Sequence, residues 1–323
     1  MTPPSPAPQL MKKALITGGN GNLGHLVAQR LSATGVEIVR FDLPGTEKHG
    51  PGAEVLGDIR DRDLMRDVFD THQPDAIIHL ASLLSGSSET DLDATWEINA
   101  TASFTLMRLA QDRKLPGPFV FASTIGTYGP NAGDPLPEDA EQWPDGFYGA
   151  TKVAVERMGV YFKANHGLDF RCLRFPLVFS PFAPASAVTA YPSHAFKAAA
   201  EGRPFTFPVA RDTGMSTMFL NDVVRSITEI ALADRDRLTK HAYNLHSFFA
   251  SAGDVEDAIK ARWQGFECSY DPHPILDARM NEKPKIIIDD SAARDWDWAP
   301  KYDFQKSAEA MFALFGLSEG AAS

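Results

Sequence analysis

The chain has 323 residues, of which 44% are hydrophobic and 23% charged, and its formal net charge at pH 7 is −11. These values are typical of a globular protein with one large domain or two smaller ones. The acidic balance argues against nucleic acid or an anionic membrane surface as the main partner, but it leaves room for a local basic pocket. Two cysteines cannot make a disulfide framework, which fits a reducing, cytoplasmic location.

The first ten residues contain four prolines. They lack the cationic start and the apolar run of a signal peptide, so we expect residues 1–10 to be a disordered lead-in. No apolar run elsewhere is long enough to span a membrane, and a membrane is therefore not an expected partner.

Short apolar runs alternate with longer amphipathic stretches in the first half of the chain. The runs predict buried strands and the stretches predict helices. In chain order we expect a strand at 13–17, a helix at 23–31, a strand at 36–41, a helix at 64–69, a strand at 76–80, a helix at 93–113, a strand at 119–122, a helix at 148–166 and a strand at 169–175. This order indicates a doubly wound parallel α/β sheet of the Rossmann type, with its ligand at the carboxyl ends of the strands.

The pattern loosens after residue 175. Short predicted helices at 193–201, 222–233 and 254–263 alternate with scattered strands such as 241–245. We therefore expect a Rossmann domain at 11–175 and a smaller mixed α/β substrate lobe at 176–318, parts of which pack back on the first domain.

The sequence TGGNGNLG at 17–24 joins the first predicted strand to the first predicted helix. Glycines at such a turn let the backbone approach a pyrophosphate, and the helix N-terminus favours the phosphate charge. The pattern alone would also suit a tight turn, but its position favours a dinucleotide. Asp42 ends the second strand, where a carboxylate binds the adenosine ribose and repels a 2′-phosphate, so we predict NAD as the cofactor.

Tyr148 and Lys152 are four residues apart on a predicted helix and so share one face. A nearby ammonium would lower the pKa of Tyr148 from about 10 toward neutrality, as a general base for an alcohol proton needs. The same spacing also occurs on solvated helices, but this helix follows the strand at 119–122 beside the expected cleft. Ser123 and Thr124 end that strand, where a hydroxyl can hold a substrate oxygen or simply cap a turn.

Together these landmarks resemble the extended short-chain dehydrogenases/reductases, the NAD-dependent epimerase/dehydratase family. The matching residues are 17–24, Asp58-Ile59, 79–82, Asn99, Ser123-Thr124, 148–152 and 174–176. The resemblance covers nearly the whole chain from Met11. It implies that Tyr148 is the acid/base, that Lys152 binds the nicotinamide ribose and that Thr124 is the hydroxyl partner. It implies cofactor contacts from Gly18, Asn20, Gly21, Asn22, Leu23, Gly24, Asp42, Leu43, Asp58, Ile59, Leu80, Ala81, Ser82, Asn99, Tyr148, Lys152 and Val178.

Several stretches resemble the short-chain type of L-threonine 3-dehydrogenases. They are 81–86, 123–126, 167–174 and 288–296. Nucleotide-sugar enzymes of the family tend to place an arginine for the diphosphate in a strand that corresponds to 216–222 here, and this stretch has none. Arg211 lies upstream and could substitute, so the epimerase alternative is weakened but not removed.

The chain also departs from the threonine enzymes. At 188–191 this chain has VTAY, whereas the threonine enzymes have a sequence similar to TTDY in the corresponding loop. At 281–284 it has NEKP, where a serine-tryptophan-proline motif is expected. The stretch 207–213 is similar to sugar-acid dehydrogenases of the same branch, so a hydroxy or sugar acid is an alternative to an L-threonine-like amino acid. The candidate substrate-binding residues are Ser85, Thr124, Tyr148, Thr189, Arg211 and Met218, with Arg211 as the one evident carboxylate clamp.

The predicted activity is oxidation of a secondary alcohol on a small polar substrate by hydride transfer to NAD. One alternative is an NDP-sugar 4-epimerase or dehydratase that keeps NAD bound. Another is a non-catalytic NAD sensor, which the presence of Thr124, Tyr148 and Lys152 disfavours. The histidines show no metal-binding spacing, so no metal is predicted. The family commonly dimerises through the helices at 93–113 and 148–166, and the resemblance therefore implies a homodimer.

Overall fold

The structure, a computed structural model, describes residues 11–45, 50–185 and 187–316. The predicted lead-in at 1–10 and the last two residues of the predicted substrate lobe, 317–318, lie outside the described residues.

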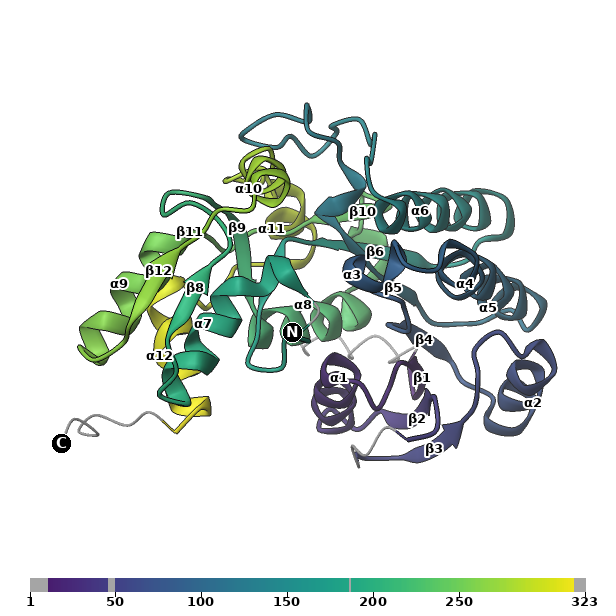
Figure 1. Ribbon diagram of the computed structural model, residues 1–323. Coiled ribbons are helices and arrows are strands. Elements are labelled where there is room, and N and C mark those ends of the chain that lie inside the picture. Colours follow the sequence, from purple (N-terminus) through teal and green to yellow (C-terminus); the bar gives the residue numbers. More distant parts are fainter. Residues whose placement is uncertain (1–10, 46–49, 186, 317–323) are drawn as a thin grey trace, which may run out of the picture.

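Seven strands form one parallel sheet in the order β10-β6-β5-β4-β1-β2-β3 (Figure 1). Their bounds are β1 Lys13–Thr17, β2 Glu37–Asp42, β3 Ala53–Leu56, β4 Ala76–His79, β5 Phe119–Thr124, β6 Phe170–Phe175 and β10 Ala242–Asn244. In the register, Leu15 of β1 lies opposite Val39 of β2 on one side and Ile77 of β4 on the other. The predicted doubly wound α/β fold is confirmed.

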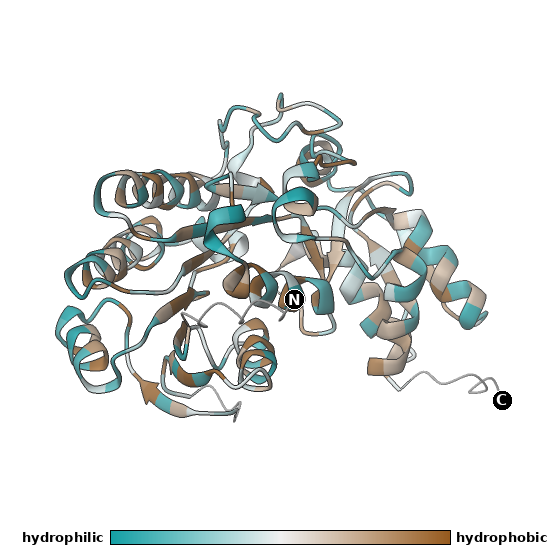
Figure 2. Ribbon diagram, turned by 180° about the vertical axis from the view of Figure 1, so that it is seen from behind, coloured by the Kyte–Doolittle hydropathy of each residue, from teal (hydrophilic) through white to brown (hydrophobic). Residues whose placement is uncertain are grey.

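Helices cover both faces of this sheet because successive strand residues point to opposite sides. Ile16 and its equivalents pack against α1 (Asn22–Ser32) and α8 (Leu220–Leu232). Leu15 and its equivalents pack against α2 (Arg62–His72), α5 (Ala102–Asp112) and α6 (Phe147–His166). Figure 2 shows the strands as mainly hydrophobic and the helices as mixed, which is the pattern of a sheet buried between two layers of helices.

The helix expected at 93–113 is interrupted. It consists of α4 (Leu92–Trp96), a π-helix at Glu97–Thr101, and α5. Single π-turns inside helices are frequently found at functional sites, and this one contains Asn99.

The second lobe is built around two small sheets. One has the order β11-β9-β7 and the other pairs β12 with β8. The strands are β7 Leu177–Phe179, β8 Phe205–Phe207, β9 Gly214–Phe219, β11 Phe248–Ser251 and β12 Cys268–Tyr270, and the helices are α7 Tyr191–Ala200, α9 Ala252–Arg262, α10 Pro274–Asn281, α11 Asp290–Trp296 and α12 Phe304–Leu314. A separate aromatic core that includes Phe179, Phe196, Phe207 and Phe312 holds this lobe together.

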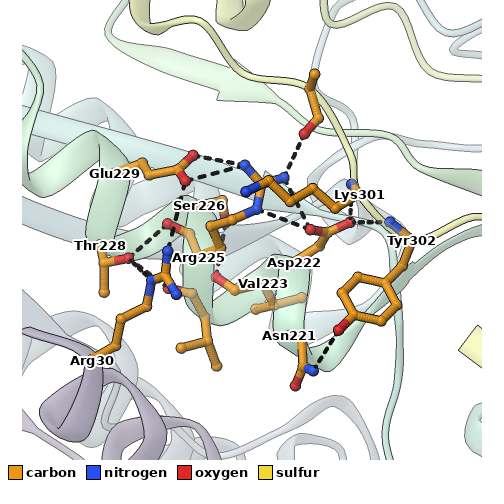
Figure 3. Close-up of polar contacts among 12 residues, drawn as sticks. Arg30, Asn221, Asp222, Val223, Arg225, Ser226, Thr228, Glu229, Lys301 and Tyr302 are labelled. Atoms are coloured by element: carbon orange, nitrogen blue, oxygen red, sulfur yellow. Dashed lines mark hydrogen bonds and ion pairs between the residues drawn. The ribbon is translucent and has the colours of Figure 1, made fainter. Parts of the chain in front are cut away.

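The two lobes are interleaved along the chain. The strand β10 completes the large sheet next to β6, and α8 packs against α1, although both elements come after residue 175. At this joint the Arg30 Nε of α1 donates a hydrogen bond to Thr228 Oγ1 of α8 at 2.9 Å (Figure 3). The buried Asp222 of α8 accepts from Arg225 and from the backbone N–H groups of Lys301 and Tyr302.

Candidate active site

In the glycine loop between β1 and α1, several glycine positions leave no room for a side chain. Gly18 has φ +70°, and a Cβ there would lie 2.9 Å from the backbone nitrogen of Ala81. A Cβ on Gly24 would collide with the carbonyl oxygen of Gly18. The helix α1 begins at Asn22 after Gly21, which has no side chain to cap the first turn. The loop therefore offers a backbone cradle and a helix N-terminus of the kind that binds a pyrophosphate.

Asp42 lies at the end of β2 with its carboxylate held toward this loop. Its two oxygens accept hydrogen bonds at 2.8 Å from the backbone N–H groups of Asn20 and Leu43. The Arg40 side chain is buried and pairs with Glu54 at 3.1 Å, so its charge is already compensated. A fixed carboxylate beside a compensated arginine suits the free ribose of NAD better than a 2′-phosphate.

Asp58 and Ile59 follow β3 at the same edge of the sheet. The Asp58 carboxylate pairs with Arg60 at 2.6 Å, and these bonds lower the pKa of Asp58. Ile59 is buried, whereas Leu43 is exposed. The resemblance puts these residues beside adenine, and their common position beyond the strand ends is compatible with that prediction.

Asn99 connects the loop after β4 to the helix α6. Its side-chain oxygen accepts from the Leu83 N–H at 2.8 Å and from Ser82 Oγ at 3.1 Å. Its side-chain nitrogen donates to Thr151 Oγ1 at 3.3 Å. Leu80 and Ala81 are in turn tied to Thr17 of β1 by hydrogen bonds at 3.1 and 3.4 Å. Asn99 thus supports the active-site helix through its side chain.

The helix α6 lies against the turn that follows Thr124. A Cβ on Gly149 would collide with the carbonyl oxygen of Gly126, so the neighbour of Tyr148 must be a glycine for this approach. Thr124 Oγ1 accepts a hydrogen bond from the Gly126 N–H at 3.0 Å. The hydroxyl therefore caps the turn as an acceptor, and this bond does not use its proton.

Lys152 is buried at the end of β5. Its Nζ donates to the carbonyl oxygen of Ala122 at 2.9 Å and lies 5.4 Å from the centre of the Tyr148 ring. Tyr148 and Lys152 share one face of α6, Lys152 reaches Ala122 of β5, and Gly149 packs against the turn that follows Thr124, so the three residues lie around the carboxyl end of β5. Tyr148 bonds to Ser82, and the adjacent Ala81 packs against Gly18 of the glycine loop.

The predicted lowering of the Tyr148 pKa is wrong for this structure. Burial raises the pKa of Tyr148 to about 12, and a hydrogen bond with Ser82 acts in the opposite direction. Burial also lowers the pKa of Lys152 to about 8. The physical reason is that burial takes each charge away from water, and the ammonium bonds the Ala122 carbonyl rather than the phenol.

The remaining substrate-binding candidates have different surroundings. Ser85 begins the short exposed helix α3 (Ser85–Ser88), which contacts α6, and Thr189 lies in the 3-10 helix Val188–Ala190 beside β7. Met218 is fully buried in the main core opposite Val178, so it does not line an open site here.

Arg211 does not fit the predicted role of carboxylate clamp. Its guanidinium pairs with Glu256 and Asp257 of α9, the second at 2.8 Å. Arg211 also lines an open pocket of about 340 Å³. Three aspartates line the same pocket and disfavour the binding of an anion there; the other lining residues besides Arg211 are Asp212, Ser251, Gly253, Asp254 and Asp257. We therefore remove Arg211 from the candidate site.

Two charged residues near the site were missed in the sequence. Glu156 is one helical turn beyond Lys152 and is buried, and its spacing from Tyr148 and Lys152 could have revealed it. Lys283 lies 3.9 Å from Asp145, which precedes Tyr148 by three residues. No local pattern could have predicted the pair of Lys283 and Asp145, because it joins segments that are distant in the sequence.

Among the described residues, no group of three or more His, Cys, Asp or Glu could hold a metal ion. In the same part of the chain, no helix is both long and apolar enough to cross a membrane.

Comparison with known proteins decides the family. Residues 14–245 match the NAD dependent epimerase/dehydratase family. The chain belongs to this family. Its cofactor is accordingly NAD, and it is an oxidoreductase that acts on CH–OH groups.

The similarity to individual members of this family covers nearly the whole chain. It is 31% identical over 312 residues to an uncharacterised epimerase/dehydratase of Staphylococcus saprophyticus, covering 93% of this chain and 96% of the relative. It is 26% identical over 311 residues to the mitochondrial L-threonine 3-dehydrogenase of Bos taurus, covering 94% and 83%. The holo form of a GalE-like L-threonine dehydrogenase from Cupriavidus necator matches with a TM-score of 0.87 and 27% identity over 94% of this chain and 99% of that one.

Proposed function

We propose that this chain is an NAD-dependent dehydrogenase that oxidises a secondary alcohol of a small polar acid, either an L-threonine-like amino acid or a hydroxy or sugar acid. The observation that carries the proposal is that Tyr148 and Lys152 lie together on α6 against the end of β5, where the turn after Thr124 packs on Gly149. The similarity to threonine dehydrogenases over the whole chain supports the same reaction class.

Bound NAD supplies the acceptor for the hydride of the carbinol carbon. The chain supplies the groups that control the proton. Thr124 donates a hydrogen bond to the substrate oxygen and orients it, and Tyr148 takes the hydroxyl proton. Lys152 holds the ribose and stabilises the phenolate. Burial raises the pKa of Tyr148 to about 12 and so works against this step, which is why the positive charge of Lys152 beside the ring is needed.

Purified protein with NAD and a panel of L-threonine, small hydroxy acids and sugar acids tests this proposal. We expect at least one acid to reduce NAD, and Tyr148→Phe to lose that activity while still binding NAD. Equal rates in Tyr148→Phe and the parent would refute the assignment of Tyr148.

Lys283 is our candidate for the partner of a substrate carboxylate, in place of Arg211. Its Nζ lies 3.9 Å from Asp145 in the loop before Tyr148, a long separation for an ion pair, and its side chain is 21% exposed. We expect Lys283→Ala to raise KM for the acid about tenfold and to leave kcat nearly unchanged, since a surface cation contributes uniform binding. An unchanged KM would exclude Lys283 from the site.

The epimerase alternative remains open to a direct test. Residues 216–222 run from β9 into α8 without an arginine, which leaves a buried diphosphate without a cation at that point. Incubation with UDP-sugars and NAD, followed by analysis of the sugar, distinguishes the two activities. Formation of an epimer without net NADH would favour the epimerase.

We further propose a homodimer formed through α4, α5 and α6. Large apolar side chains are exposed along this face, among them Trp96, Phe104 and Tyr161. Large apolar side chains exposed on neighbouring helices are typical of an interaction site. Light scattering of the parent and of Phe104→Glu tests this, with a dimer expected for the parent and a monomer for the variant. The predicted cytoplasmic location stays a prediction.

A further inference from the structure

A single buried carboxylate lies behind the three catalytic groups. Glu156 is on the same face of α6 as Tyr148 and Lys152, at successive spacings of four residues. Its exposed fraction is 1%, and that of Lys152 is 4%. None of the predicted roles uses this residue.

Glu156 accepts hydrogen bonds from three segments that surround the site. Ser123 Oγ of β5 donates to it at 2.5 Å, and Gln142 Nε2 of the loop before α6 donates at 2.9 Å. Arg174 of β6 pairs with it through Nε at 3.1 Å and Nη2 at 2.7 Å. The carboxylate therefore ties the helix of Tyr148 to the ends of both neighbouring strands.

The other side of Arg174 extends this network past the catalytic threonine. Arg174 Nη1 donates to the Tyr128 hydroxyl at 2.6 Å, and Tyr128 donates to Asn244 Oδ1 of β10 at 2.8 Å. Ser123 precedes Thr124, and Tyr128 ends the turn that Thr124 caps. Both ends of the Thr124 segment are thus anchored to one ion pair.

We propose that Glu156 is a positioning residue, which through Ser123 and Arg174 fixes the Thr124 segment of β5 against the Tyr148 and Lys152 face of α6. The proposal rests on the function proposed above and deepens it. Buried ion pairs contribute little net stability, because desolvation offsets their attraction. A role in fixing geometry accounts for this one better than a role in stability, since all its partners end at the catalytic edge.

The same carboxylate also supports the charge on Lys152. Burial lowers the pKa of Lys152, whereas Cys172 of β6 and Glu156 of α6 act in the opposite direction. Burial raises the pKa of Cys172 well above its usual value, so the thiol is neutral, and burial lowers the pKa of His79 of β4 to about 3, so the imidazole is neutral too. Tyr148 is also a neutral phenol. Among the groups that act on the Lys152 ammonium, Glu156 is the carboxylate on the same helix, one turn away on the same face.

The chain offers a matched control. Asp222 and Arg225 of α8 form a second buried ion pair, with exposed fractions of 0% and 6%, bonded to backbone N–H groups as well (Figure 3). This pair lies at the joint with α1 and has no bond to Thr124, Tyr148 or Lys152 among the described contacts. Asp222→Asn therefore removes a comparable buried charge away from the catalytic groups.

The experiment compares the parent with Glu156→Gln, Ser123→Ala and Asp222→Asn. For Glu156→Gln we expect kcat to fall about 10- to 100-fold with KM and NAD affinity within about threefold, as for a small misplacement of reacting groups. Titration of the Lys152 side chain by NMR in the cofactor-free protein should show its midpoint about one pH unit lower. Asp222→Asn should lose stability but keep the parent kcat and the parent Lys152 midpoint.

Three outcomes would overturn the proposal. They are a parent-like kcat in Glu156→Gln, an unshifted Lys152 titration in that variant, and an equal loss of kcat in Asp222→Asn. If Glu156→Gln does not fold, Ser123→Ala decides, because it removes one bond and no charge: a several-fold lower kcat supports positioning, and a parent-like kcat refutes it. If the parent oxidises no acid, the proposed function fails, and the Lys152 titration still tests the influence of Glu156.

Discussion

Lys152 and Arg211 are two cations that sequence reasoning assigned to the same site, and the structure gives them opposite surroundings. Lys152 is buried, donates to a backbone carbonyl and has no ion pair among the described residues. The Arg211 side chain is 51% exposed and is paired with two carboxylates of α9. A buried cation without a direct counterion keeps its charge available to a ligand, whereas a surface arginine between two acids does not.

The largest effect is expected from Lys152. We expect Lys152→Met to lower kcat/KM about 10²- to 10⁴-fold, because the phenolate of Tyr148 would lose its neighbouring positive charge. Steady-state kinetics of the parent and the variant measure this. Lys163→Met, further along α6, is the control and should retain most activity. Activity within threefold of the parent in Lys152→Met would abolish the contrast.

The second prediction concerns the backbone cradle on which the contrast depends. Gly24→Ala should weaken NAD binding at least about tenfold, since the new Cβ collides with the Gly18 carbonyl oxygen and must move the loop. Titration calorimetry with NAD measures the change. In the control variant Gly117→Ala, the new Cβ would lie 2.8 Å from the backbone oxygen of Asp75, at the opposite end of the sheet from the glycine loop. This control should lower stability and leave NAD binding intact.

The pH dependence of stability gives a third test. The pKa of Lys152 is lowered to about 8 by burial, so between pH 8 and its ordinary value of 10.5 the unfolded chain binds more protons than the folded one. The Lys152 contribution to the free energy of unfolding therefore rises with pH across this window. Urea unfolding at pH 8 and pH 9.5 should show a rise in the parent that is smaller in Lys152→Met. An equal rise in both proteins would contradict the lowered pKa.

The smallest effect is expected from Arg211. Arg211→Ala should change kcat/KM for an acid substrate less than about twofold, because its charge is already satisfied by Glu256 and Asp257. A tenfold rise in KM would restore Arg211 as the carboxylate clamp and remove the reason for preferring Lys283.

The fold and the centre of the site could be predicted from local sequence because their signals are local. The glycine loop, the carboxylate of Asp42 and the spacing of Tyr148 and Lys152 each lie within one strand–helix unit. The failures concern residues whose partners are distant. Arg211 is neutralised by a helix some 45 residues further on, as the bond to Glu256 shows. Met218 is buried because β9 pairs with β7, and no periodicity within 214–219 reveals that pairing.

The pKa of Tyr148 was mispredicted for a related reason. The spacing of Tyr148 and Lys152 gives the distance between two charges, but it carries no information on how much water surrounds them. The structure shows that desolvation is the larger effect for both groups. Burial by segments far away in the chain therefore set the sign of the shift.

The position of β10 has a consequence for the engineering and evolution of this enzyme. The strand supplies one edge of the cofactor sheet, next to β6, although it comes from the second half of the chain. A chimera that exchanged everything after residue 175 would import a foreign edge strand and a foreign partner for α1 along with the new specificity. Exchange of the second half of the chain therefore cannot transfer substrate preference alone. In such a fold, the preference must change by substitutions within loops while the interleaved scaffold is kept.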